Sequence, residues 1–301
     1  MRNMRPSRAP LMASLLDREP APPVPWGGFD LLVVTGIYLL LQFVALSLAG
    51  NEPLPVVVPP ELVGYQELRV GEAASPWPVA ALREIGRPSR GVVTAHWSMK
   101  LMAAGSAATL LAMIASIVYL RLVRRATWSD LGLRSPEPWR DILRGLGTFG
   151  VVAIPIFTLH AIVNWLLEPE QGHPIIEAVM RYPGFFWLSL VTAVIIAPVT
   201  EEFFFRGLLL GWLDSLPTAR ETDAHGRPRL AWWPVVLTST GFALLHLGHG
   251  AAPVALLFFS LVLGWLYQRH HRLLPCITLH AALNGTSMLM LAGELVRRGA
   301  W

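Results

Sequence analysis

The chain has 301 residues, of which 53% are hydrophobic and only 15% are charged, with a formal net charge of +4. A soluble domain usually carries about 25% charged residues, so this composition argues against a soluble fold and indicates a polytopic membrane protein. The single cysteine, Cys276, excludes an intrachain disulfide and a CxxC motif. Phosphate loops and basic–aromatic stretches are absent, so we expect neither a nucleotide nor a nucleic acid as partner.

The first 28 residues are rich in arginine and proline and lack an apolar core of signal-peptide length. We therefore expect residues 1–28 to form a flexible basic tail rather than a cleaved signal. A second group of arginines lies in the link after the second apolar run, at 121–144. By the positive-inside rule, the tail and this link are expected on the cytosolic side of the membrane.

Seven apolar runs are long enough, or nearly so, to cross a bilayer, which takes about 20 residues in a helix. They cover 31–49, 101–120, 145–167, 182–200, 230–247, 251–267 and 273–292. An eighth span is added if 203–213 crosses separately, and this choice leaves the side of the C-terminus open. We predict an all-α membrane bundle of seven or eight transmembrane helices. The proline-rich link at 50–99 is expected outside and is unlike a regular soluble domain.

The third run contains His160 and Asn164, which are four positions apart and share a helix face. We interpret them as residues that hydrogen-bond between helices, with the wall of a cavity as the alternative.

Two adjacent glutamates, Glu201 and Glu202, follow the uncharged run 182–200, and Arg206 comes one turn later. Ionisable side chains at membrane depth are costly and are retained mainly for chemistry, ion movement or mutual pairing. Glu202 and Arg206 have the i, i+4 spacing with the acid first, which favours an ion pair. We expect this structural pair to leave Glu201 facing a cavity. The alternative is a single interfacial ion cluster of all three residues.

Three further polar residues occur within the later runs. His246 ends the segment Phe242-Ala243-Leu244-Leu245-His246, and His280 and Asn284 are four positions apart in the last run. Both members of the second pair therefore point the same way. A structural, hydrogen-bonded histidine is the alternative for His246, and packing between helices is the alternative for Asn284.

Together, one carboxylate, two imidazoles and a carboxamide on three helices are the parts that hydrolysis needs. A glutamate in a desolvated site is a good base toward water. Imidazole N–H and carboxamide NH₂ groups can hold the oxyanion of a tetrahedral intermediate. Alternatively, Glu201, His246 and His280 could ligate Zn²⁺ and leave a fourth position for water.

The motifs EExxxR, FxxxH and HxxxN occur in this order on successive predicted membrane helices. This combination resembles the CPBP intramembrane proteases, also called the CAAX protease and bacteriocin-processing, or Abi, family, over roughly 187–290. The resemblance implies a catalytic membrane core at 181–293. The apolar runs predict N-terminal transmembrane helices with the long outer link at 29–180 before this core, and a C-terminal tail at 294–301 follows it.

The resemblance also assigns roles to the motif residues. Glu201 would activate water, His246 would assist it or position the water, and His280 with Asn284 would hold the oxyanion. Glu202 and Arg206 would support the site. Members of the family are commonly described as metalloproteases, but the HExxH spacing is absent here. We therefore favour the metal-free assignment, with zinc as the alternative.

These observations predict a multi-pass intramembrane endopeptidase that cuts a peptide bond near the membrane surface. Its expected partners are membrane lipid and a peptide or protein substrate, and the sequence leaves open whether that substrate is prenylated. The first alternative is a non-catalytic membrane protein of the same fold, acting in bacteriocin immunity or as a scaffold. A transporter or proton relay ranks last, because the first three runs carry no charge and no inverted repeat is evident.

Overall fold

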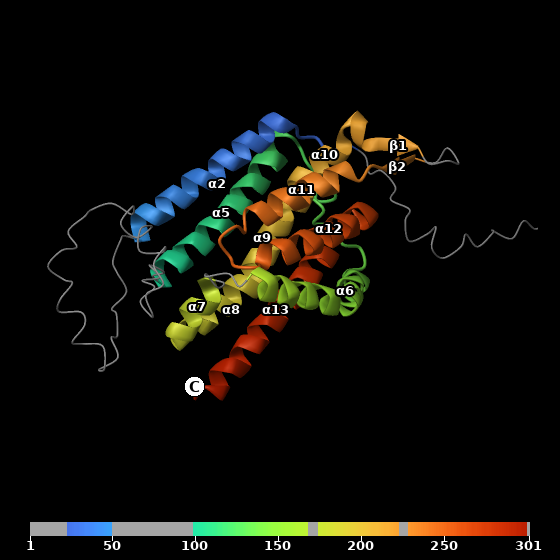
Figure 1. Cartoon of the computed structure of the whole chain (residues 1–301). Helices are drawn as coiled ribbons and strands as arrows, with labels where there is room; N and C mark the ends of the chain where they lie inside the picture. The colour runs from blue at the N-terminus through green and yellow to red at the C-terminus, as the bar shows by residue number, and fades with distance from the viewer. Residues whose placement is uncertain (1–22, 50–98, 168–173, 223–227, 300–301) are drawn as a thin grey trace, which may run out of the picture.

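The computed structural model describes residues 23–49, 99–167, 174–222 and 228–299. Within these ranges the protein is a bundle of helices with one short antiparallel hairpin (Figure 1). The predicted all-α membrane fold is confirmed. Most of the tail expected over 1–28, and nearly all of the link expected over 50–99, lie outside the described residues.

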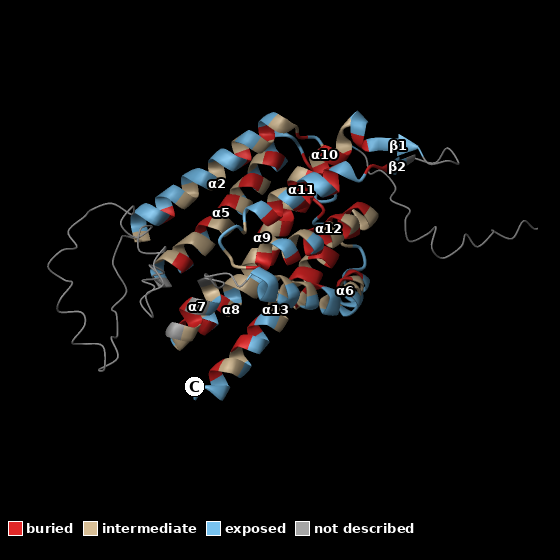
Figure 2. Ribbon diagram, viewed as in Figure 1, coloured by how far each residue is buried: buried red, intermediate tan, exposed pale blue. Residues whose placement is uncertain are grey.

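The first two helices, α2 (Gly28–Ala49) and α5 (Met99–Val123), lie side by side along one flank of the bundle (Figure 1). Gln42 of α2 donates to the hydroxyl of Thr109 on α5 at 2.7 Å. The outward face of α2 is apolar and exposed (Figure 2). A helix that is hydrophobic all round and still exposed fits a lipid-facing position.

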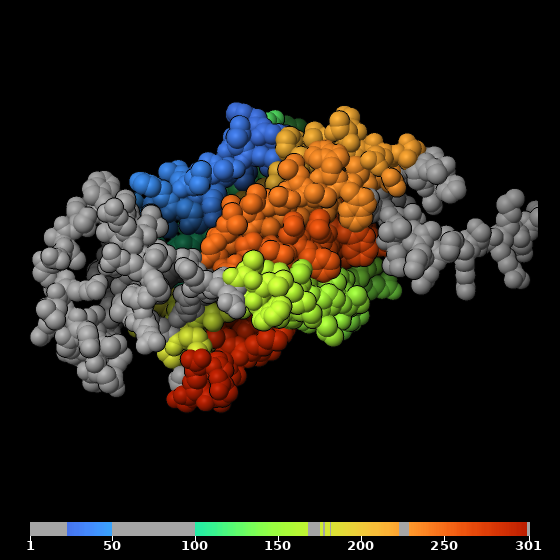
Figure 3. Space-filling model, viewed as in Figure 1, coloured from blue at the N-terminus to red at the C-terminus, as the bar shows by residue number. Residues whose placement is uncertain are grey.

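The third helix, α6 (Pro138–Leu167), lies on the opposite flank and packs against the last two helices. It starts seven residues before the run predicted at 145–167. On the face shown in Figure 3, α11 and α12 (orange) lie between α2 (blue) and α6 (green).

A long helical rod forms the centre of the bundle and runs without a break from Pro183 to Ser215, over 33 residues. At 1.5 Å per residue it is about 50 Å long, more than the roughly 30 Å hydrocarbon core. The alternative with an eighth span is therefore wrong, because 203–213 continues the same rod. The Glu202–Arg206 pair described below neutralises two charges inside it, so the chain has no need to leave the membrane there. The rod and the short helix before it comprise α7 (Pro174–Arg181), η2 (Pro183–Phe185), α8 (Phe186–Val191), η3 (Thr192–Ile196), α9 (Ala197–Glu202), η4 (Phe203–Leu210) and α10 (Gly211–Ser215).

A short connection follows the rod. It contains η5 (Pro217–Ala219) and the hairpin of β1 (Arg220–Thr222) with β2 (Pro228–Leu230), in which Glu221 pairs with Arg229.

Three helices complete the chain: α11 (Trp233–Leu244), α12 (Ala252–His270) and α13 (Leu273–Arg297). With 12 residues, α11 covers only about 18 Å and is shorter than the run predicted at 230–247. The described chain thus has six helices long enough to cross a membrane, plus one shorter apolar helix.

Contacts between helix ends define one end of the bundle, which we call the N-face. Arg124 after α5 pairs with Asp30 in α2 at 2.6 Å, and Arg272 before α13 pairs with Asp141 in α6 at 3.0 Å. The same face holds the last turns of α10 and α12. The chain therefore passes up and down between two faces, and the end of α13 lies on the face opposite the start of α2 (Figure 1).

Candidate active site

The two glutamates lie in α9, a short α-helical piece of the rod between two π-helical segments, η3 and η4. A π-turn adds a residue to the helical turn and rotates everything beyond it, and such turns are frequent at functional sites. Glu202 faces the inside of the bundle and is fully buried, whereas the neighbouring Glu201 side chain is 31% exposed. The rod thus places the two carboxylates in different environments.

The buried side of α9 is held by an ion pair within the rod. Arg206 Nη1 donates to Glu202 Oε1 at 2.9 Å, and both side chains are almost completely buried. The pair predicted from the i, i+4 spacing is therefore present. Arg206 Nη2 also donates to the hydroxyl of Ser260 on α12 at 2.7 Å. The guanidinium lies over the ring of Phe242, with 4.9 Å between its Cζ atom and the ring centroid.

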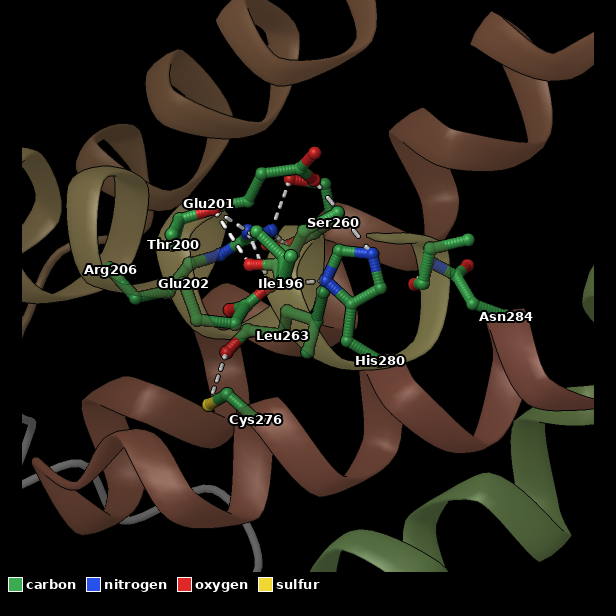
Figure 4. Close-up of polar contacts among 12 residues, drawn as sticks. Ile196, Thr200, Glu201, Glu202, Arg206, Ser260, Leu263, Cys276, His280 and Asn284 are labelled. Atoms are coloured by element: carbon green, nitrogen blue, oxygen red, sulfur yellow. Dashed lines mark hydrogen bonds and ion pairs between the residues drawn. The ribbon is translucent and has the colours of Figure 1, made fainter. Parts of the chain in front are cut away.

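His280 on α13 connects this buried pair to Glu201. Its Nδ1 atom donates to Glu202 Oε1 at 2.8 Å, and its Nε2 atom lies 3.8 Å from Glu201 Oε2. Figure 4 shows the two glutamates approaching the two nitrogens of the ring. Phe242 and Phe259 pack edge-on against the imidazole, so the ring has little freedom to turn. Glu202 therefore fixes which nitrogen faces Glu201.

In the described part of the chain, no basic side chain other than His280 reaches the Glu201 carboxylate. The charge of Glu202 is already balanced by Arg206, so Glu201 is the acid that remains available. An acid that is partly exposed, unpaired by arginine and close to one imidazole has the environment expected of a base.

His246 lies just beyond the end of α11 and is only partly buried. Its Nδ1 atom donates to the carbonyl of Phe242 at 2.8 Å, which leaves Nε2 as the acceptor nitrogen of a neutral ring. Within the described ranges it makes no hydrogen bond to Glu201 or His280. Instead, Phe242 packs against both imidazoles, with centroids 4.7 Å from His246 and 6.1 Å from His280.

The loop between α11 and α12 also carries His249, whose ring lies 5.4 Å from that of His246. Burial lowers the pKa of His249, and the neighbouring His246 lowers it further.

Asn284 is one turn beyond His280 on α13, and its amide is directed to the backbone of the rod. Nδ2 donates to the carbonyl oxygen of Ala193 in η3 at 2.8 Å. The structure thus places His280 and Asn284 on one face of α13, as predicted, but their hydrogen-bond partners lie on different parts of the rod.

The second pair with this spacing, His160 and Asn164, does not join the site. Asn164 is exposed, and neither side chain has a hydrogen bond among the residues that the structure describes. The interpretation as interhelical hydrogen bonds is therefore wrong. The two residues lie on a stretch of α6 that faces outward, beyond the part that packs on α13.

The metal alternative needs Glu201, His246 and His280 to gather around one point. Over the described ranges, no group of three His, Cys, Asp or Glu side chains is close enough to hold an ion. The donor set therefore does not fit a zinc site in this arrangement, and we derive no step through a metal.

Two participants were missed by the sequence reasoning. Ser260 is one hydroxyl in an apolar helix, a common feature of packing, and gives no signal of its partner. The carbonyl of Ala193 carries no side-chain signal. Pro198, five residues later, was the available clue, because proline removes a backbone donor.

Comparison with known families supports the resemblance of the motifs. Residues 183–286, about a third of the chain, match the family model described as "Type II CAAX prenyl endopeptidase Rce1-like". The matched segment contains the rod, α11, α12 and the part of α13 that carries His280 and Asn284. No match was found among curated proteins or among solved structures. The chain is thus similar, over about a third of its length, to a family of CAAX-type endopeptidases.

Proposed function

We propose that this protein is an intramembrane endopeptidase in which Glu201 activates water. The observation that carries the proposal is the approach of Glu201 Oε2 to His280 Nε2 at 3.8 Å, while Nδ1 of the same ring is bonded to Glu202. The match to a CAAX-type endopeptidase family supports the same reaction class.

In the proposed reaction, Glu201 removes a proton from water while the water oxygen bonds to the carbonyl carbon of the scissile peptide. The carbonyl electrons move to its oxygen and form an oxyanion. A doubly protonated His280 donates Nδ1–H to Glu202 and presents Nε2–H to this oxyanion. Collapse re-forms the carbonyl, breaks the C–N bond and returns the proton from Glu201 to the leaving amine, so the carboxylate is regenerated.

His246 is proposed to position the water, as the family resemblance implies. Its Nδ1–H is engaged by the Phe242 carbonyl, so Nε2 is left as an acceptor.

We further propose that the N-face is cytosolic and that cleavage takes place near this surface. The helix ends and links of the N-face carry most of the arginines of the described chain, which the positive-inside rule places in the cytosol. His280 is seven residues from the start of α13 at this face, a distance of about 10 Å along the helix. The proposed substrate is a membrane-bound peptide or protein, prenylated or not.

The proposal is tested by cleavage of candidate peptides with the full chain in detergent or liposomes, read by mass spectrometry of the fragments. We expect Glu201→Gln to lower kcat by about 10²–10⁴-fold, the usual contribution of a general base. His280→Ala is expected to lower it similarly. Glu294→Gln is the matched control, because Glu294 pairs with Arg297 and Arg298 at the other end of α13.

Equal turnover by the parent and Glu201→Gln would remove the protease assignment. A biological phenotype that survives Glu201→Gln at unchanged expression would instead favour the non-catalytic immunity or scaffold role.

A further inference from the structure

The backbone of the rod is short of one hydrogen-bond donor just before the glutamates. In an α-helix, the carbonyl of Ala193 would accept from the N–H of Ala197. Here the N–H of Ala197 donates to Thr192 instead, in the π-helical pattern of η3. The corresponding π-type donor for Ala193 would come from residue 198, but that residue is Pro198, which has no N–H.

The Ala193 carbonyl is therefore left without a backbone donor inside the rod. Ala193 is half-buried, and a backbone carbonyl that loses contact with water without gaining a partner is costly. The structure supplies the missing donor from another helix, since Asn284 Nδ2 on α13 lies 2.8 Å from this oxygen. This bond joins α13 to the segment directly preceding α9, which carries Glu201.

We propose that Asn284 is a positioning residue for Glu201: its amide replaces the donor that Pro198 removes, and so fixes the rotation of α9 about the rod axis. The proposal rests on the function proposed above and gives Asn284 a different role from direct oxyanion binding. A π-segment can change register by one residue, and one residue corresponds to about 100° of helix rotation. Such a rotation would turn Glu201 away from His280.

Helix α13 thus supplies two hydrogen bonds to the rod, one near each end of the segment that carries Glu201. His280 holds Glu202 at one end of α9, and Asn284 holds Ala193 about two turns earlier. The two bonds are separated along the rod by nine residues, so together they fix the orientation of the segment as well as its position. Loss of either bond removes one of these two restraints on the rotation of α9.

The proposal is tested by a double-mutant cycle between Asn284→Ala and Pro198→Ala. The alanine at 198 supplies the N–H that the π-helical register of η3 lacks for the Ala193 carbonyl. We expect Asn284→Ala to lower kcat by about 100-fold, the size of effect that a small misplacement of a catalytic group can produce. Pro198→Ala alone is expected to change kcat by no more than about threefold, and the double variant to recover to within about tenfold of the parent.

An oxyanion donor would behave differently, because a backbone N–H at 198 cannot replace it. Additive losses in kcat would therefore overturn the proposal. Pro155→Ala in α6 is the matched control for a proline replacement within a membrane helix, and it is expected to leave the Asn284→Ala defect unchanged. Rates are compared well below the unfolding temperature of every variant, so that stability does not enter.

The midpoint of thermal unfolding in detergent provides a readout that needs no substrate. If the parent cleaves nothing, the proposed protease function fails. Thermal unfolding of the parent, the two single variants and the double variant still decides whether Asn284 bonds to the Ala193 carbonyl. A non-additive effect on the midpoint supports the replacement of the missing donor by Asn284. An additive effect overturns it.

Discussion

Glu202 on the rod and His280 on α13 are 78 positions apart in the chain and share a hydrogen bond of 2.8 Å from which solvent is excluded. The same oxygen of Glu202 accepts from Arg206, so one carboxylate oxygen holds both a cation and the imidazole that faces Glu201. The other oxygen, Oε2, is buried without a hydrogen bond among the described residues. The position of Glu202 therefore depends on these two bonds.

This relationship predicts unequal losses of stability at the two adjacent glutamates. Glu202→Gln removes the counter-charge of a buried arginine and is expected to destabilise the protein by about 3–5 kcal/mol. Glu201→Gln changes a partly exposed side chain that has no arginine partner and is expected to leave the unfolding midpoint within about 2 °C of the parent. The measurement is thermal unfolding of the detergent-solubilised protein, followed by fluorescence of a thiol-reactive or tryptophan probe.

Each of these two variants serves as the control for the other, because both replace a glutamate by a glutamine at adjacent positions. Equal losses of stability would show that both acids belong to one structural ion cluster, which is the alternative noted for the sequence.

The sequence was sufficient to predict which of these two acids pairs with Arg206. The i, i+4 rule pairs Glu202 with Arg206 whatever the tertiary structure, because it depends only on helix geometry. The same rule could not separate His280 and Asn284 from His160 and Asn164. Periodicity states which side chains share a helix face, whereas the neighbour of that face is decided by tertiary packing.

The membrane spans were predictable for a similar reason, since the length and polarity of a run set its ability to cross lipid. The continuation of the rod through 203–213 was not, because the charges at Glu202 and Arg206 look like the end of a span. Only their mutual pairing makes them compatible with a continuous helix. The π-segments also escaped prediction, because a change of helical register leaves composition unaltered.

Ser260 provides a second prediction about the buried pair. Its hydroxyl accepts from Arg206 Nη2 at 2.7 Å, while the Ser260 carbonyl is 3.5 Å away. Ser260→Ala leaves one guanidinium nitrogen with only the longer contact and is expected to cost about 1–3 kcal/mol. The measurement is the shift in unfolding midpoint, together with the cleavage rate at a temperature where all variants are folded.

Ser239 on α11 is a matched control, because it is fully buried and its hydroxyl has no hydrogen bond in the described part of the protein. Ser239→Ala removes an unsatisfied polar group and is expected to be neutral or slightly stabilising. Equal destabilisation by both alanines would show that the Arg206 contact contributes nothing specific.

The close approach of α6 and α13 provides a third prediction. A Cβ atom at Gly145 would lie 2.6 Å from the carbonyl oxygen of Pro275 and 2.7 Å from Cβ of Thr278. Gly145→Ala therefore forces α6 away from the start of α13, and we expect the free energy of unfolding to fall by about 1–3 kcal/mol. Because α13 carries His280, a fall in cleavage rate is expected as well.

Gly147 lies two residues further along α6 and has nothing within 4 Å of its added Cβ. Gly147→Ala is expected to leave stability unchanged or to raise it by up to about 1 kcal/mol, because alanine favours helix more than glycine does. Similar behaviour of the two variants in thermal unfolding would contradict the tight packing of α6 on α13.

The last prediction concerns metal removal. The Nδ1 atoms of His280 and His246 are engaged by Glu202 and by the Phe242 carbonyl, and the described residues include no three-donor group able to hold an ion. If Glu201 alone generates the attacking hydroxide, incubation with a strong chelator followed by buffer exchange should leave kcat within about twofold of the untreated protein. Metal content is measured on the same samples by mass spectrometry. Loss of activity on chelation that is restored by stoichiometric Zn²⁺ would mean that His246 moves to join Glu201 and His280 around an ion. In that case His246→Ala should lower zinc affinity as well as rate, whereas a water-positioning histidine would lower the rate alone.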